Sequence, residues 1–160
     1  MKRITAVFLL LLSLFLVGCG ADISAYQDRE ILVVGLAEED FSVTPRQLSE
    51  MKCTSETATG QSAKAGTVTA YGPTLDTFLA HYGRDKSEFK CIRFTAEDGY
   101  DVVLGPVTWE KRTVILSIAN GSKPLDAYQQ PMRVVIPGGS SGNRVRMVTK
   151  IEFVPLESGQ

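Results

Sequence analysis

Residues 16–19, Leu-Val-Gly-Cys, have the types and order of a lipobox, the signal at which a cysteine is acylated and becomes the mature N-terminus. They end an apolar run from Ala6 to Val17 that follows two basic residues. Because this run is short for a bilayer span and ends on a small residue, it predicts an export signal over residues 1–18. Several acyl chains on Cys19 would hold the protein at the extracytoplasmic face of a bacterial cell membrane. The alternative is an ordinary signal peptide that happens to contain Cys19.

Two further cysteines, Cys53 and Cys91, would remain in the mature chain. Disulfides persist outside the cytoplasm, and with Cys19 carrying lipid these two are the available pair. We expect a Cys53–Cys91 disulfide. The alternative is two free thiols, of which Cys53 would be a reactive group or a metal ligand.

Other common catalytic arrangements lack their parts. His81 is the only histidine and is expected on the exposed face of a helix, and neither Ser140 nor Ser141 has a histidine base at a recognisable spacing, which argues against a serine hydrolase. Without Lys2 and Arg3 the chain has 15 basic and 18 acidic residues and no block of like charge. Nucleic acid is therefore not an expected partner.

Cleavage after residue 18 would leave 142 of the 160 residues, the usual size of one domain. We expect a polar tether over residues 19–29, a folded domain over residues 30–155 and a short tail over residues 156–160.

Two helices are predicted by their capping residues. The stretch from Thr44 to Gln47 matches a capping box, with Pro45 at the first helical position. From Leu75 to Tyr82 apolar residues recur at helical spacing behind an N-cap at Thr74, and Gly83 is expected to stop the helix.

Most of the remaining sequence favours strands. Asp98-Gly99 predicts a hairpin with a primed turn, and Asn120-Gly121 is a second hairpin signal. A last strand is expected to alternate, with Val145, Met147, Ile151 and Phe153 on one face and Arg144, Arg146, Lys150 and Glu152 on the other. The other expected strands are Ile31 to Val34, Cys53 to Thr59, Thr67 to Tyr71, the segments on either side of Asp98-Gly99, and Thr113 to Ile118. The sequence thus predicts an α+β domain that is mostly β, with two or three short helices.

The order of these motifs resembles the molybdopterin-binding oxidoreductase domain of the sulfite oxidase type over about residues 30–153. The resemblance is carried by Val34-Gly35-Leu36, the Thr44-Pro45 helix start, the Gly72 to Leu75 helix start, Ala96 to Tyr100, Asn120-Gly121 with Pro124-Leu125, Pro131 to Gly138, and Val148 to Ile151. Each motif is common alone, so their order and spacing carry the resemblance.

The resemblance implies a compact fold around a molybdenum atom that is held by a pterin dithiolene and one cysteine, and oxygen-atom transfer as the chemistry. The matching position for that cysteine lies near Thr59 or Gly60, and neither residue is a thiol. Cys53 is six residues earlier, about 20 Å away along an extended strand, and remains the alternative metal ligand.

The resemblance also implies a binding site for the pterin and its phosphate. Backbone N–H groups of a glycine-rich loop beside two arginines could cradle a phosphate. The alternative for the glycine-rich segment is a hairpin loop, with Arg144 and Arg146 on the solvated face of the following strand. The alternative for Arg133, which interrupts an apolar strand, is structural pairing with Asp98. The expected cofactor-binding residues are Asp98, Tyr100, Arg133, Gly138, Gly139, Asn143, Arg144 and Arg146.

Two functions follow as expectations. The first is a lipid-anchored redox protein that binds molybdopterin, with an electron-transfer partner. The second is a relative of this fold that has lost the cofactor and acts as a ligand-binding or protein-interaction module at the cell surface.

Overall fold

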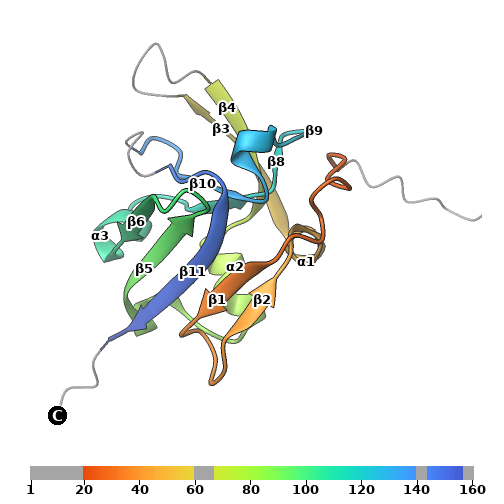
Figure 1. Ribbon diagram of the computed structural model, residues 1–160. Coiled ribbons are helices and arrows are strands. Elements are labelled where there is room, and N and C mark those ends of the chain that lie inside the picture. Colours follow the sequence, from red (N-terminus) through yellow and green to blue (C-terminus); the bar gives the residue numbers. More distant parts are fainter. Residues whose placement is uncertain (1–19, 60–66, 140–143, 157–160) are drawn as a thin grey trace, which may run out of the picture.

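The computed structural model describes residues 20–59, 67–139 and 144–156. Two sheets and a two-stranded ribbon surround a large apolar core, and a small second cluster of Ala58, Ala70, Ile115 and Val135 lies between the second sheet and the ribbon (Figure 1). No helix within the described residues has the length and hydropathy to cross a membrane.

The larger sheet has five strands in the order β2-β1-β11-β5-β6. The central strand, β11, runs parallel to β1 and antiparallel to β5. Strand β2 pairs antiparallel with β1 and β6 pairs antiparallel with β5, and these two strands form the edges. The strand bounds are β1 Ile31–Val34, β2 Phe41–Val43, β5 Phe89–Ala96, β6 Asp101–Leu104 and β11 Val148–Pro155.

The second sheet has the order β3-β4-β8-β9, and a separate ribbon pairs β10 with β7. The long β3–β4 hairpin extends away from the five-stranded sheet (Figure 1). The strand bounds are β3 Cys53–Thr59, β4 Thr67–Pro73, β7 Ile115–Ser117, β8 Ala119–Asn120, β9 Lys123–Pro124 and β10 Arg133–Val135.

Both predicted helices are present. In α1 (Pro45–Glu50) the Thr44 side chain accepts from the backbone N–H of Gln47, while the Gln47 side chain accepts from the Thr44 N–H. Helix α2 (Leu75–His81) starts at an N-cap on Thr74. A third helix and two 3₁₀ turns were not predicted: α3 (Pro106–Trp109), η1 (Lys86–Glu88) and η2 (Ala127–Gln129).

The core joins the five-stranded sheet to α2 and the ribbon. Phe78 of α2, Phe89 of β5 and Phe153 of β11 are fully buried and pack ring against ring. Strands β4 and β7 approach so closely that a Cβ at Gly72 would collide with the carbonyl oxygen of Leu116. Only glycine fits there.

Two local predictions are wrong in detail. Asp98 does not have a positive φ, so the β5–β6 turn is not primed; instead Gly99 N–H donates to Ala96 O and Gly99 has φ 84°. The alternation expected after Arg144 is also broken, because β11 starts only at Val148 and a register shift between Val148 and Lys150 places both Val148 and Ile151 in the core. Val145, Ile151 and Phe153 are buried as expected, so the departure is confined to Met147 and Val148.

The hairpin at Asn120-Gly121 is shorter than expected. It joins the two-residue strands β8 and β9, whereas β7 pairs with β10. The expected tether also contains a core residue, because Tyr26 is 1% exposed; its hydroxyl donates to Ile118 O and accepts from Leu125 N–H.

Candidate functional site

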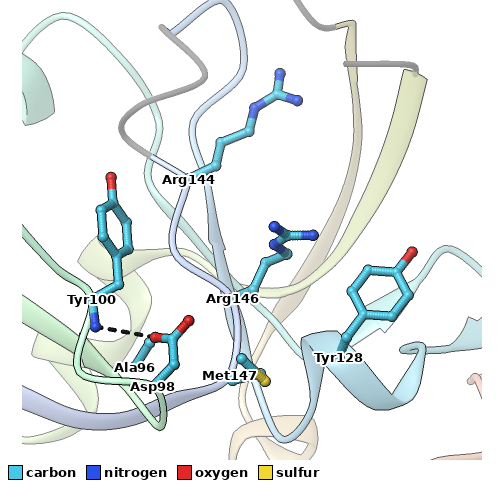
Figure 2. Close-up of a pocket in the computed structure, with 7 residues that line it drawn as sticks. All are labelled: Ala96, Asp98, Tyr100, Tyr128, Arg144, Arg146 and Met147. Carbon is cyan, nitrogen blue, oxygen red and sulfur yellow. Dashed lines mark hydrogen bonds between the residues drawn. The ribbon is translucent and has the colours of Figure 1, made fainter. Parts of the chain in front are cut away.

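A pocket of about 450 Å³ opens between the β5–β6 turn, η2 and the segment that precedes β11. Figure 2 shows Tyr100 and Tyr128 on opposite sides of the pocket, with the two arginines between them. The lining residues are Ala96, Asp98, Tyr100, Tyr128, Arg144, Arg146 and Met147. We call this the arginine pocket.

The β5–β6 turn holds the acidic side of the arginine pocket. Ala96 N–H donates to Tyr100 O at 2.8 Å, which closes the turn, and Tyr100 N–H donates to Asp98 Oδ1 at 3.0 Å. This second bond fixes one carboxylate oxygen, so the other is free to face a ligand.

The segment before β11 is held from three sides. Met147 has φ 52°, an uncommon conformation for a residue with a side chain. Its N–H donates to Gln129 O at 3.3 Å, its carbonyl accepts from Glu97 N–H at 2.8 Å, and Val145 O accepts from Val134 N–H at 2.8 Å. These bonds tie the segment to η2, the β5–β6 turn and β10, and they place Arg144 and Arg146 in the pocket.

Arg146 lies against an aromatic wall. Its guanidinium carbon is 5.5 Å from the ring centroid of Tyr128, within the range of a cation–π contact. Tyr128 itself is 55% exposed. The face of this ring is therefore turned toward the arginines.

Arg133, on β10, is the buried member of the cluster. It is 4% exposed, and its Nε and Nη2 atoms are buried with no hydrogen-bond partner among the described residues. Nε of Arg144 is buried and unpartnered in the same way. Burial and the charge of Arg144 lower the pKa of Arg133, whereas Asp126 and Tyr128 raise it. A guanidinium nevertheless stays charged in a protein, so this buried charge is offset in part by the charge of Asp126, while two of its nitrogens have no hydrogen-bond partner among the described residues.

The expected Arg133–Asp98 pairing is not formed among the described residues, where Asp98 instead accepts from the Tyr100 backbone. Gly138 and Gly139 do not line the arginine pocket: Gly138 lies against Arg112, and Gly139 N–H closes a turn onto Ile136 O. Asn143 lies outside the described residues, as does Cys19.

Cys53 and Cys91 are free thiols in the structure, and the expected disulfide between them is not formed. They lie on different sheets, Cys53 on β3 and Cys91 on β5. The Cys53 thiol donates to Leu48 O at 3.6 Å, and burial raises its pKa. A buried thiol with a raised pKa is a poor nucleophile and a poor metal ligand.

Thr59, at the other end of β3, reaches the edge of the arginine pocket. Its carbonyl accepts from Arg144 Nη2 at 3.4 Å. Cys53 stands opposite Pro73 in the β3–β4 register, whereas Thr59 stands opposite Thr67 at the far end. The end of β3 at which the resemblance implies a cysteine therefore lies beside the arginine pocket. The residue at this end is Thr59, which has no thiol.

Sequence reasoning missed Tyr128 and Met147. Tyr128 lies in a short 3₁₀ turn that no capping or periodic signal announced. Met147 was expected on the apolar face of a continuous strand. In the structure this strand begins only at Val148, and no feature of the sequence indicated that start.

The architecture confirms the predicted α+β fold, which is mostly β. It is similar to the crystal structure of the sulfane dehydrogenase SoxCD from Paracoccus pantotrophus, with a TM-score of 0.66 and 19% identity over 82% of this chain. The match covers 40% of that protein's chain, so this chain spans less than half of its length. No family model and no curated protein matches the sequence. A likeness at this identity shows the fold.

The fold implies a molybdopterin group, and the residues present fit only one part of it. Two guanidiniums with buried, unpartnered N–H atoms, Arg144 in the pocket lining and Arg133 beside it, together with the exposed Arg146, suit a phosphate. The metal end needs a thiolate, but the described pocket lining holds none and the adjoining strand end carries Thr59. Nor do the described residues hold a group of three or more His, Cys, Asp or Glu side chains placed to bind a metal. The donor set fits an organic phosphate and does not fit molybdenum.

Proposed function

We propose that this chain is a lipid-anchored, extracytoplasmic ligand-binding domain that uses a sulfite oxidase-type fold to hold a phosphate-bearing ligand in the arginine pocket. The observation that carries the proposal is the set of buried, unpartnered N–H groups on Arg133 and Arg144 beside the pocket. Leaving buried polar groups unpaired costs about 1–3 kcal/mol each, and more when they are charged.

A phosphate would relieve this cost in several ways. It supplies acceptor oxygens for Nε and Nη2 of Arg133 and for Nε of Arg144, and its negative charge offsets the repulsion among the three guanidiniums. Arg146 is exposed at the pocket mouth and can reach the same anion. Charge-assisted bonds are about twice as strong as neutral ones.

Oxygen-atom transfer is the competing function. The likeness to a sulfane dehydrogenase supports it, but the residue at the expected ligand position is Thr59, and the half-buried Cys53 lies at the opposite end of β3. These residues favour binding without metal chemistry. The arginine pocket then binds and orients a ligand, and no residue in it is assigned a catalytic step.

The anchoring part of the proposal rests on the lipobox. If Cys19 is acylated, six residues separate it from Tyr26, which is buried in the fold. The domain would then lie within about 25 Å of the membrane surface, given the reach of an extended chain.

The test is the thermal unfolding of the exported Cys19→Ser chain in phosphate and in chloride at equal ionic strength. A ligand at 100 times its Kd stabilises a folded protein by about 2.7 kcal/mol, so phosphate should raise the Tm by several degrees. The double variant Arg144→Gln, Arg146→Gln should lose this shift. The matched control Arg46→Gln, Arg93→Gln removes two exposed arginines outside the arginine pocket and should keep it. An equal phosphate shift in both double variants would overturn the proposal.

A further inference from the structure

Strand β3 (Cys53–Thr59) is the last strand of the second sheet, so one of its two edges has no neighbouring strand among the described residues. It pairs with β4 along its whole length without a register shift, and the hairpin extends away from the five-stranded sheet (Figure 1). A regular strand edge of this kind offers its main-chain groups to another strand.

The main-chain groups that face outward can be assigned from the register. Cys53 stands opposite Pro73, which has no N–H, so these two residues form a pair without inter-strand hydrogen bonds. The alternation of an antiparallel ladder then turns the N–H and C=O groups of Cys53, Ser55 and Thr57 away from β4. Thr59 is next in this series, and its C=O accepts from a side chain of the arginine pocket.

This edge lacks the features with which proteins usually protect an exposed strand. Such strands are often very short, twisted by a bulge, or carry lysine or proline. Strand β3 contains neither lysine nor proline, its register with β4 has no bulge, and its single charged residue is Glu56. The edge is therefore open to another strand, and the side chains of β3 decide which strand fits.

Two copies of β3 match each other across a two-fold axis. With Ser55 on the axis, the two strands run antiparallel, and Cys53 lies opposite Thr57 of the second copy. Each of these outward-facing pairs exchanges both of its N–H···O bonds. In the same register Glu56 lies opposite Thr54, whose hydroxyl can donate to the carboxylate. A register centred on Glu56 would instead place two like charges opposite each other.

We propose that two copies of this chain associate through β3 and join their four-stranded sheets into one continuous sheet. This association is separate from ligand binding, because no residue from Cys53 to Thr57 lines the arginine pocket. A captured peptide is less favoured, since domains that add a peptide strand gain specificity from pockets for its side chains, whereas Ser55 and Thr57 are small and exposed. If Cys19 is acylated, both copies lie at one membrane, and the raised effective concentration favours a small contact.

Sedimentation of the exported Cys19→Ser chain over a range of concentrations tests the association, and we expect a monomer–dimer equilibrium. Ser55→Pro removes an outward N–H without removing a bond to β4. Because both copies lose this bond at the axis, the dimer should weaken about tenfold or more. The matched control Ser55→Ala keeps the N–H and should keep the dimer. Both variants should retain the circular dichroism of the parent chain, which shows that they are folded.

Disulfide cross-linking tests the register without weakening the contact. In a hydrogen-bonded pair the Cα atoms are about 5.5 Å apart, a distance that a disulfide can bridge. In a chain whose three native cysteines are changed to serine, Ser55→Cys should therefore cross-link to its counterpart under mild oxidation with copper phenanthroline. Thr59→Cys places the two thiols about eight residues apart along the paired strands, roughly 27 Å, and should cross-link far less.

The results separate the association through β3 from phosphate binding. A monomer at every concentration, or equal cross-linking at the two positions, would overturn the association. A dimer that persists unchanged in Ser55→Pro would also overturn it, since the contact would then lie elsewhere on the chain. Loss of the phosphate effect on the Tm in a chain that still forms the β3 dimer would overturn the proposed function alone.

Discussion

At the residue scale, Arg133 departs most from what a small β-rich domain normally buries. Its neighbours on β10 are apolar, and two of its guanidinium nitrogens have no partner among the described residues. Side chains of this kind are rarely buried without a compensating charge. The proposed anion would offset more of this cost than Asp126 does, and in that proposal Arg133 links ligand binding to the stability of the fold.

Arg133→Met provides the test, because methionine fills a similar volume without the charge. In phosphate-free buffer we expect the free energy of unfolding to rise by about 1–2 kcal/mol, in line with other proteins in which buried charges were replaced by apolar side chains. The increase in stability with phosphate should disappear in the same variant. Chemical denaturation with and without phosphate measures both effects.

The control for this variant is Arg93→Met, on the solvated face of the five-stranded sheet, which should keep the phosphate effect. An Arg133→Met chain that is less stable than the parent in phosphate-free buffer would contradict the account. It would show that Arg133 stabilises the fold without a ligand.

At the element scale, sequence predicted best where local chemistry decides. The capping box at Thr44 and Gln47, the N-cap at Thr74 and the β3–β4 hairpin formed as expected, because each depends on residues close together in the chain. The last strand was predicted in part: Ile151 and Phe153 are buried as expected, but the strand starts only at Val148, because its register is set by pairing with β5, more than 50 residues away. The bulge after Val148 and the positive φ of Met147 therefore had no local signal.

The same contrast explains what could be foreseen of the arginine pocket. Arg144 and Arg146 stood out as basic residues near a glycine-rich segment, and Asp98 and Tyr100 belonged to a recognisable turn. Tyr128 joins them only through the tertiary fold, since Gln129 O accepts from Met147 N–H. The two predicted glycines, Gly138 and Gly139, instead form a turn of their own.

Close packing between β4 and β7 gives a prediction at this scale. Gly72→Ala places a Cβ against the backbone carbonyl of Leu116. Relieving this clash requires the backbone of β4 or β7 to shift, because the contact is with main-chain atoms and not with the end of a flexible side chain. We expect a loss of roughly 3 kcal/mol or more, typical of overpacking in a core. In Gly105→Ala, by contrast, the added Cβ meets nothing closer than 4.0 Å.

Gly105→Ala should therefore cost only about 1 kcal/mol or less, because Gly105 is the N-cap of α3 and alanine is a poorer N-cap than glycine. Urea denaturation of both variants measures the difference. Equal stability of the two variants would contradict the claim that β4 and β7 lie too close together for a Cβ at residue 72.

At the scale of the whole molecule, the N-terminal segment links the proposed membrane anchor to the fold. Tyr26 enters the core and bonds to Ile118 and Leu125, so the folded part begins earlier in the chain than residue 30. The ion pair between Arg29 and Glu97 connects the same segment to the β5–β6 turn, which lines the arginine pocket. An acylated Cys19 would thus hold the pocket close to the membrane.

Cys19→Ser tests the anchor. Without acylation the export signal alone provides no stable attachment, so the variant should move from the membrane to the soluble extracytoplasmic fraction. Fractionation with high-salt and carbonate washes, followed by immunoblotting against the parent chain, measures the shift. Retention of the variant on washed membranes would show that something other than the lipid holds it there.

The most direct test of the central claim is the molybdenum content of the parent chain, purified from a host that makes molybdenum cofactor and measured by mass spectrometry. With Thr59 at the strand end beside the arginine pocket and Cys53 half-buried at the opposite end, the account predicts far less than about one molybdenum atom per folded chain. Near-stoichiometric molybdenum that is lost in Cys53→Ser would contradict it. The chain would then be a metal-bearing redox protein, and Cys53 would be the ligand.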